Sequence, residues 1–279
     1  MPKEKTVTIN LTPPPLQRLL EYVVEKYGVL QENCGIHGGV ASITRCSKCH
    51  WESYAPGGSY QYSCYNYRCV YLIRYLATQV VQIADLIAEH VLSSIDEQPL
   101  ISAFSFGGGP GVEALALIDQ LRNCDGEYDL AFVNVDYEQS WKPIYRDLTQ
   151  TLVKWINNVK LASRFLTIDV TTDFSGGRNS SDVVFLSWIL SEVNKDDQLR
   201  VLRKAHKLAR ADGYILIIDR TEEDLFSNIF DALTKIKTYT LIEYNPTYEK
   251  NCGLDFPESS RDFGPKYTCR AAYLVLKKV

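Results

Sequence analysis

Residues 100–117, LISAFSFGGGPGVEALAL, join three patterns that predict a strand, a tight turn and a helix. The first pattern, Leu100–Ser105, is a short and mostly apolar run of the length expected for a buried strand. Glycines at positions 107, 108, 109 and 111 follow, with Pro110 among them. Glycine permits positive φ angles and lets a ligand approach the backbone closely. Because apolar residues recur at helical spacing from Val112, the glycine turn is a candidate ligand site between a strand and a helix.

The chain beyond this stretch repeats the alternation of strand and helix patterns. Short, continuously apolar strands separated by helices are typical of a parallel sheet with helices on both faces. We therefore expect an α/β protein with a Rossmann-like sheet. The further strands are expected at Leu130–Val135, Phe165–Ile168, Val183–Leu186, Tyr214–Ile218, Tyr239–Tyr244 and Ala271–Leu276.

The chain before this stretch has a different character, and the change falls near Gln98-Pro99. Helix patterns are expected at residues 16–27 and 65–91, and the glycine- and proline-rich residues 35–58 are expected to form a loop. We therefore predict a helical, cysteine- and tyrosine-rich cap over residues 1–98. The α/β core is predicted over residues 99–279.

Two aspartates stand at the ends of the second and third predicted core strands. Asp136 lies 25 residues after Gly111, and Asp169 ends the next strand. Parallel sheets bind ligands beyond the carboxyl ends of their strands, where an acid at the end of the second strand accepts hydrogen bonds from ribose hydroxyls. An isolated aspartate at a strand end is commonly a turn residue or a helix cap. Three such features on consecutive strands favour a nucleotide-like cofactor.

This order of strand, GxGxG turn, helix, strand, Asp, helix, strand and Asp resembles the class I S-adenosylmethionine-dependent methyltransferases over residues 99–279. The resemblance implies a seven-stranded sheet whose last two strands form a reversed hairpin at one edge. It implies that the glycines lie under the methionine part of the cofactor, that Asp136 holds the ribose, and that Asp169 reads the adenine. Ser187 would lie beside the methionine and the substrate. The implied cofactor-binding residues are Ser105, Phe106, Gly107, Gly109, Gly111, Asp136, Tyr137, Asp169, Val170 and Ser187.

One position departs from the family pattern. The family usually has Asp or Glu two residues before the first glycine, and this chain has Ser105 there. A hydroxyl can still hydrogen-bond the amino group of the cofactor, although it carries no charge. The run FSFGGGPG at residues 104–111 is also similar to that of some eukaryotic ribosomal-RNA methyltransferases.

Three alternatives to a methyltransferase were weighed against the same residues. An NAD-dependent oxidoreductase normally carries G-x-G-x-x-G, which the glycines here do not match, and the chain shows no recognised hydride-transfer pair. A catalytically silent module that binds the cofactor and reports its level to a partner stays open. A binding domain without any cofactor stays open too.

The methyl acceptor stays open between a small molecule, a protein side chain and RNA. After the fourth core strand the chain reads Leu186-Ser187-Trp188-Ile189, without the Asn/Asp-Pro-Pro-Tyr of enzymes that methylate exocyclic amino groups. No cysteine lies between Cys124 and Cys252, which excludes the cysteine-dependent attack on a pyrimidine C5 atom. Candidate substrate-binding residues are Tyr71, Tyr75 and Trp188. Ordinary packing explains the two tyrosines equally well, and packing is the commoner role of a tryptophan beside a strand.

Cysteine spacing in the cap suggests a structural zinc site. Cys46 and Cys49 form a CxxC pair, and Cys64 and Cys69 follow at a looser spacing. Cys34 and His50 are alternative ligands. Buried thiols without a metal, or a redox pair, explain the same residues.

Composition sets the class of protein. Thirty basic and 34 acidic residues give a net charge of −4, which disfavours a broadly basic nucleic-acid binder without excluding a local patch. Hydrophobic residues make up 46% of the chain, which excludes a disordered or collagen-like protein. We see no signal-peptide pattern and no apolar run near the ~18 residues of a membrane span. We therefore expect a cytoplasmic or nuclear protein with reduced thiols and no membrane partner.

Overall fold

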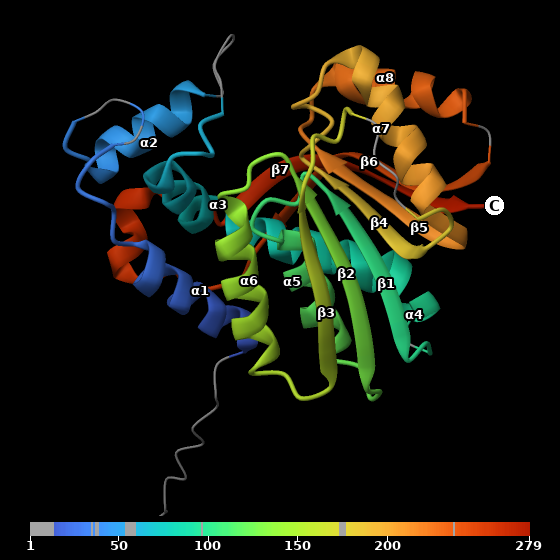
Figure 1. Ribbon diagram of the computed structural model, residues 1–279, viewed down its shortest axis with the longest axis horizontal. Helices are drawn as coiled ribbons and strands as arrows, with labels where there is room; N and C mark the ends of the chain where they lie inside the picture. Colours follow the sequence, from blue (N-terminus) through green and yellow to red (C-terminus); the bar gives the residue numbers. More distant parts are fainter. Residues whose placement is uncertain are drawn as a thin grey trace, which may run out of the picture.

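The computed structural model describes residues 14–34, 36, 39–53, 60–95, 97–172, 177–236 and 238–279. A seven-stranded sheet forms its centre, in the order β3-β2-β1-β4-β5-β7-β6 (Figure 1). Strands β1 to β5 run parallel, and β7 is antiparallel to both of its neighbours. This confirms the α/β, Rossmann-like fold and the reversed hairpin at one edge. The strands are β1 Leu100–Phe106, β2 Tyr128–Asp136, β3 Val159–Thr167, β4 Ser181–Ser187, β5 Ala209–Asp219, β6 Tyr239–Asn251 and β7 Thr268–Lys278.

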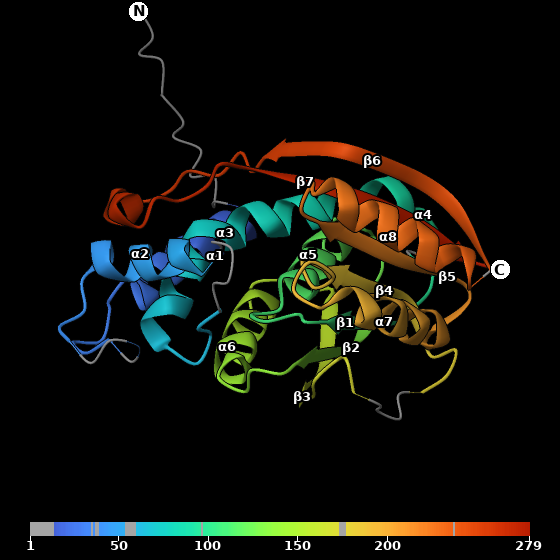
Figure 2. The same cartoon turned by 90° about the horizontal axis from the view of Figure 1, so that it is seen from above.

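Helices cover both faces of this sheet (Figure 2). One face carries α5 (Val112–Leu121) and α6 (Trp141–Val153), whose buried side chains join one hydrophobic cluster. The other face carries α7 (Lys195–Leu208) and α8 (Glu223–Thr234), whose buried side chains join a second cluster. The near-continuous burial of β4 agrees with a strand covered on both sides.

The cap is helical and lies to the left in both figures. It consists of α1 (Pro15–Tyr27), α2 (Ile43–Glu52) and α3 (Tyr65–Leu86). Helix α3 continues through a π-helical turn, η1 (Ile87–Val91), into α4 (Leu92–Ile95), and a 3-10 helix, η2 (Glu258–Phe263), joins the cap late in the chain. Because α3 packs on α5, the cap and this face of the core share one hydrophobic cluster.

Helix α2 corrects the expected loop at residues 35–58. It begins after Ser42, whose hydroxyl accepts a hydrogen bond from the Arg45 N–H at 3.2 Å, as an N-cap residue does. Its buried face is made of Cys46, Cys49 and His50, so no run of large aliphatic residues announces it in the sequence. Residues 35, 37–38 and 54–58 of the expected loop lie outside the described residues.

One helix is longer than the sequence pattern predicted, since the pattern placed it at residues 65–91. Within the described residues, Tyr65–Ile95 forms 31 helical residues with a window of mean hydropathy 1.3, enough in length and composition to cross a membrane. However, 78% of that window is buried inside the protein. Burial of this extent is the pattern of a central core helix, since the apolar side chains already have protein partners.

Candidate functional site

Three strand ends meet at one edge of the sheet. Phe106 at the end of β1 pairs with Val135 of β2 and Leu186 of β4, so residues 107, 136 and 187 follow side by side. Strands β1 and β4 are also where the strand order reverses, the place where α/β sheets bind ligands. The sequence therefore brings its glycine turn and its first aspartate to the expected position.

The glycine turn is bound directly to Asp136. The Gly109 N–H donates to Asp136 Oδ2 at 2.9 Å, and the Glu138 N–H donates to Asp136 Oδ1 at 2.8 Å. Gly107 has a φ of +63°, and a Cβ at this position would lie 2.6 Å from Ile189 Cδ1. Only glycine allows the turn to pass so close to the segment that follows β4.

A cavity opens over this edge. We call the glycine turn with the ends of β2 and β4 its floor, and the ring cluster of Tyr62, Tyr71 and Trp141 its aromatic wall. The lining side chains come from the core and the cap together. They belong to Tyr62, Tyr71, Val112, Glu113, Asp136, Tyr137, Trp141, Ser187, Trp188, Ile189 and Glu192, with backbone from residues 107–110.

A second cavity adjoins the first. The two share Gly107, Tyr137, Ile189 and Glu192 in their linings. Its remaining wall comes from the turn after β3, the segment that leads into α7, and Tyr60 of the cap. The additional lining residues are Tyr60, Asp169, Val170, Thr171, Val193, Asn194 and Asp197.

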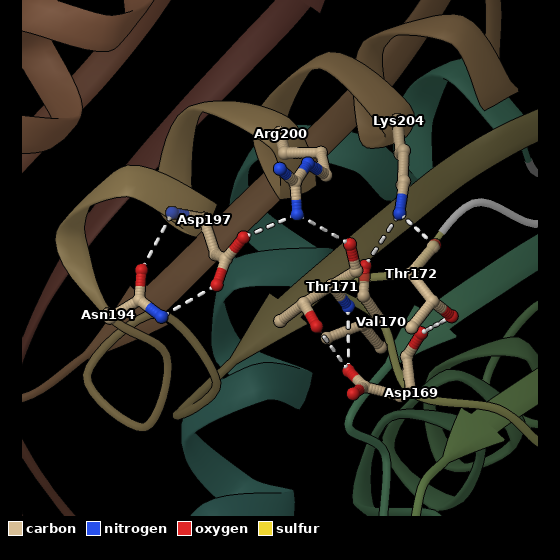
Figure 3. Close-up of polar contacts among 8 residues, drawn as sticks. All are labelled: Asp169, Val170, Thr171, Thr172, Asn194, Asp197, Arg200 and Lys204. Carbon is tan, nitrogen blue, oxygen red and sulfur yellow. Dashed lines mark hydrogen bonds and ion pairs between the residues drawn. The ribbon is translucent and has the colours of Figure 1, made fainter.

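The turn after β3 is tied to α7 by basic side chains (Figure 3). Arg200 donates to the Thr171 carbonyl at 3.0 Å, and Lys204 donates to the Val170 carbonyl at 2.9 Å. Asp169 Oδ1 accepts from the backbone N–H and the hydroxyl of Thr171 at 2.8 and 2.7 Å. These bonds hold Asp169 and Val170 at the second cavity and leave the other Asp169 oxygen for a ligand, because a carboxylate offers about four acceptor positions.

Three carboxyl groups of the first cavity have raised pKa values. Burial raises the pKa of Asp136 to about 6, that of Glu113 to about 7 and that of Glu192 to about 8. Neighbouring acids add to the effect, Asp136 on Glu113 and Asp219 on Glu192. A positively charged ligand would lower these pKa values, since an opposite charge favours the ionised form of a carboxyl group.

Three polar atoms without partners lie at the floor of the first cavity or directly behind it. Ser105 Oγ, Glu113 Oε2 and Ser187 Oγ are buried, and no hydrogen bond reaches them from the described residues. Buried polar atoms are normally satisfied, so such a group indicates a ligand that supplies the missing donors and acceptors.

Most of the predicted cofactor residues lie at these cavities. Gly107, Gly109, Asp136, Tyr137 and Ser187 line the first, and Asp169 and Val170 line the second. Of the predicted substrate residues, Tyr71 and Trp188 line the first cavity. Trp188 also has a φ of +53°, an uncommon conformation for a large side chain that recurs at functional sites.

Four predicted residues lie elsewhere. Phe106 is fully buried against Phe104, with ring centroids 4.9 Å apart. Gly111 caps α5 and packs below Tyr145, and Ser105 is buried behind the lining. Tyr75 stacks on His50 at 5.4 Å instead of facing either cavity.

Four aromatic or acidic lining residues of the first cavity were not predicted from the sequence. The sequence contained a signal for Glu113. The acid that the family usually has before the glycines is absent at position 105, and Glu113 is an acid two residues after the last glycine of the turn. Tyr62 and Trp141 come from segments that only the tertiary fold brings together. Glu192 follows Ser187 by five residues, but an acid in a charged segment is usually solvated surface.

The predicted zinc ligands do not form a metal-binding set. Cys46, Cys49, Cys64 and Cys69 are buried, and the Cys49 thiol hydrogen-bonds Cys34. Among the described residues, Glu89, His90 and Glu243 alone place three possible ligand atoms within 4.8 Å of one another. Cys69 lies inside α3, beyond the start of the helix where Cys64 is the N-cap residue, so the two thiols leave the helix in different directions.

Comparisons with known proteins found distant structural neighbours and no sequence match. No protein-family model and no curated protein matches this chain. The N-methyltransferase NodS from Bradyrhizobium japonicum WM9, solved with S-adenosylhomocysteine, is 12% identical with a TM-score of 0.44, over 74% of this chain and 87% of that one. The magnesium protoporphyrin IX methyltransferase ChlM from Synechocystis PCC 6803, solved with S-adenosylmethionine, is 12% identical with a TM-score of 0.48, over 72% and 80%. The [4+2]-cyclase SpnF is 12% identical with a TM-score of 0.47, over 71% and 81%. Each of these TM-scores is below 0.5, and no conclusion about this chain rests on these likenesses.

Proposed function

We propose that this protein binds S-adenosylmethionine and transfers its methyl group to an acceptor held against the aromatic wall of the first cavity. The observation that carries the proposal is the floor of that cavity. There the glycine turn, the buried Asp136 and three polar atoms without partners lie together at the strand ends. When bound, the cofactor would supply an electrophilic methyl group on a positively charged sulfur atom.

Each part of the cofactor has residues of suitable chemistry. Asp136 spends one acceptor position of each oxygen on Gly109 and Glu138, which leaves acceptor positions for two ribose hydroxyls. Asp169 and Val170 at the second cavity offer an acceptor and an apolar contact for the adenine. The serine hydroxyls of the floor suit the amino-acid head of the methionine part.

The aromatic wall suits an acceptor with a flat or apolar portion. Tyr62, Tyr71 and Trp141 meet with ring centroids 5.5 to 5.8 Å apart, and Trp188 lines the same cavity. Such rings orient a flat group and exclude water, and alignment is the main contribution a protein makes to methyl transfer. Glu192, with a pKa near 8, stands between the two cavities and can exchange a proton with an acceptor at neutral pH.

Methyl transfer can be tested without knowing the acceptor. Wild-type protein and Asp136→Ala are incubated with methyl-labelled S-adenosylmethionine and three separate extract fractions, containing small molecules, proteins or RNA. We expect label to enter one fraction with the wild type and to stay at background with the variant. Cofactor binding without transfer to any fraction would overturn methyl transfer in favour of a silent, cofactor-binding module. Absence of cofactor binding by folded wild-type protein would overturn the whole proposal.

A further inference from the structure

The floor of the first cavity lacks the usual acid on β1 and has another acid close by. Ser105, the residue before the end of β1, is 0% exposed, and its hydroxyl has no partner among the described residues. A serine can accept a hydrogen bond from an ammonium group, but it cannot balance the positive charge. The site as the sequence describes it is therefore one negative charge short.

Glu113 lies where such a charge is missing. It stands in the first turn of α5, lines the cavity, and is only 2% exposed. The hydroxyls of Ser105 and Ser187 are close enough to lower its pKa, yet Oε2 has no hydrogen-bond partner among the described residues. The carboxyl group of Glu113 and both hydroxyls thus lie near one another, although they come from three elements, β1, β4 and α5.

Nothing described in the chain balances the charge of Glu113. It forms no ion pair within the described residues, whereas the other buried acid of α5, Asp119, pairs with Arg122 at 2.6 Å. The carboxyl group of Asp136 acts on Glu113 and disfavours its ionised form further. A buried carboxyl group without a partner is costly, and a positively charged ligand group is what would offset that cost.

We propose that Glu113, with Ser105 and Ser187, binds the α-ammonium group of S-adenosylmethionine and so replaces the acid absent from β1. This inference rests on the proposed function. The ligand class is an α-amino-acid head, a group that both S-adenosylmethionine and S-adenosylhomocysteine carry. The start of α5 assists, because its helix dipole favours the ionised carboxylate that an ammonium group requires.

The protonation of Glu113 makes the affinity for an ammonium ligand depend on pH. Because the pKa of Glu113 is about 7 in the ligand-free protein, a part of the molecules hold a proton there at neutral pH. An ammonium ligand favours the ionised form, so binding releases that proton and the affinity rises between pH 6 and 8. A ligand without the amino-acid head lacks this dependence on Glu113.

The decisive experiment compares two ligands on two proteins by calorimetric titration. S-adenosylhomocysteine carries the ammonium group, and 5′-methylthioadenosine lacks the whole amino-acid head. We expect Glu113→Gln to weaken the first ligand by about 10- to 100-fold, the range for a lost charge-assisted hydrogen bond, and the second by less than about threefold. Asp119→Asn, the matched change of a buried acid on the same helix, should weaken neither ligand although it lowers thermal stability.

The charge can also be moved back to β1. Ser105→Asp on the Glu113→Gln background should recover part of the affinity for S-adenosylhomocysteine, since it restores one carboxylate at the same floor. Equal weakening of both ligands in Glu113→Gln would overturn the proposal, because it would show a structural role. Unchanged binding of both would overturn it as well. If folded wild-type protein binds neither ligand, the proposed function itself fails, a result distinct from either of these.

Discussion

The floor and the aromatic wall of the first cavity differ in how far their side chains find partners within the protein. The floor, at the ends of β1, β2 and β4, holds buried acids and hydroxyls whose bonding capacity is unfilled. In the aromatic wall the rings pack on each other, and the Tyr71 hydroxyl donates to Gln79 Oε1 at 3.0 Å. Polar atoms without hydrogen-bond partners suit the floor to one defined ligand that supplies those partners. The rings of the wall already contact one another, so they would select an acceptor by its shape.

The buried acids of the floor lower the stability of the ligand-free protein, and the rings of the wall do not. Buried acids with raised pKa values destabilise the ligand-free protein near neutral pH, and rings in mutual contact stabilise it at any pH. Bound cofactor would remove the cost at the floor. Changes to the floor should therefore act on cofactor affinity and pH dependence, and changes to the wall on transfer to the acceptor.

The largest effect is expected where the floor joins the core. Gly111 has a φ of +89°, and a Cβ there would overlap the buried ring of Tyr145. We expect Gly111→Ala to cost about 3 to 5 kcal/mol, from overpacking and an unfavourable backbone conformation. Gly253→Ala is the matched control, since its φ is +63° but nothing lies within 4 Å of the added carbon. Chemical denaturation measures both, and equal losses would contradict the packing role of Gly111.

A smaller effect concerns pH and the ligand-free protein. The folded state raises the pKa of Glu113 to about 7, so it retains a proton that the unfolded chain releases near its ordinary value of 4.5. Stability is therefore lost as the pH rises from about 4.5 to 7. We expect Glu113→Gln to be more stable than the wild type by about 1 to 3 kcal/mol at pH 8 and nearly equal to it at pH 5. A variant less stable than the wild type at pH 8 would contradict this reading of the floor.

The smallest effect separates the wall from the floor. Tyr71→Ala should lower methyl transfer to the acceptor about tenfold, the value of a ring contact, and leave the Kd of S-adenosylhomocysteine within about threefold. Tyr75→Ala, one turn along α3, is the comparison, because Tyr75 stacks on His50 and lines neither cavity. Loss of cofactor affinity in Tyr71→Ala would show that wall and floor are not separate in function.

The floor was more predictable than the wall for a physical reason. Parallel strands end together, so Gly107, Asp136 and Ser187 could be placed from three apolar runs that end at one edge. The wall depends on distant segments, since Tyr62 precedes α3 and Trp141 begins α6, and no local pattern places them in contact. Side-chain direction was a further obstacle within the floor, where Phe106 turns into the core and Glu113 turns into the cavity.

The alternatives for the cap were resolved unevenly. The sequence allowed the tyrosines of α3 either to pack in the core or to line the cleft. In the structure Tyr71 lines the first cavity, and Tyr75 stacks on His50. Helix α2 escaped prediction because its buried face is made of Cys46, Cys49 and His50 instead of aliphatic residues. Hydrophobic periodicity detects only helices that bury aliphatic or aromatic side chains.

The central claim is that the floor binds S-adenosylmethionine through Asp136. Calorimetric titration of the wild type, Asp136→Ala and Asp129→Ala with S-adenosylmethionine tests it most directly, because Asp129 is an exposed acid near the start of the same strand. We predict micromolar affinity for the wild type and Asp129→Ala, and a loss of at least about 100-fold for Asp136→Ala, since each ribose hydroxyl would lose a bond to a charged group. Circular dichroism confirms that all three proteins are folded. Absence of binding to the folded wild type, or equal binding by Asp136→Ala, would contradict the claim.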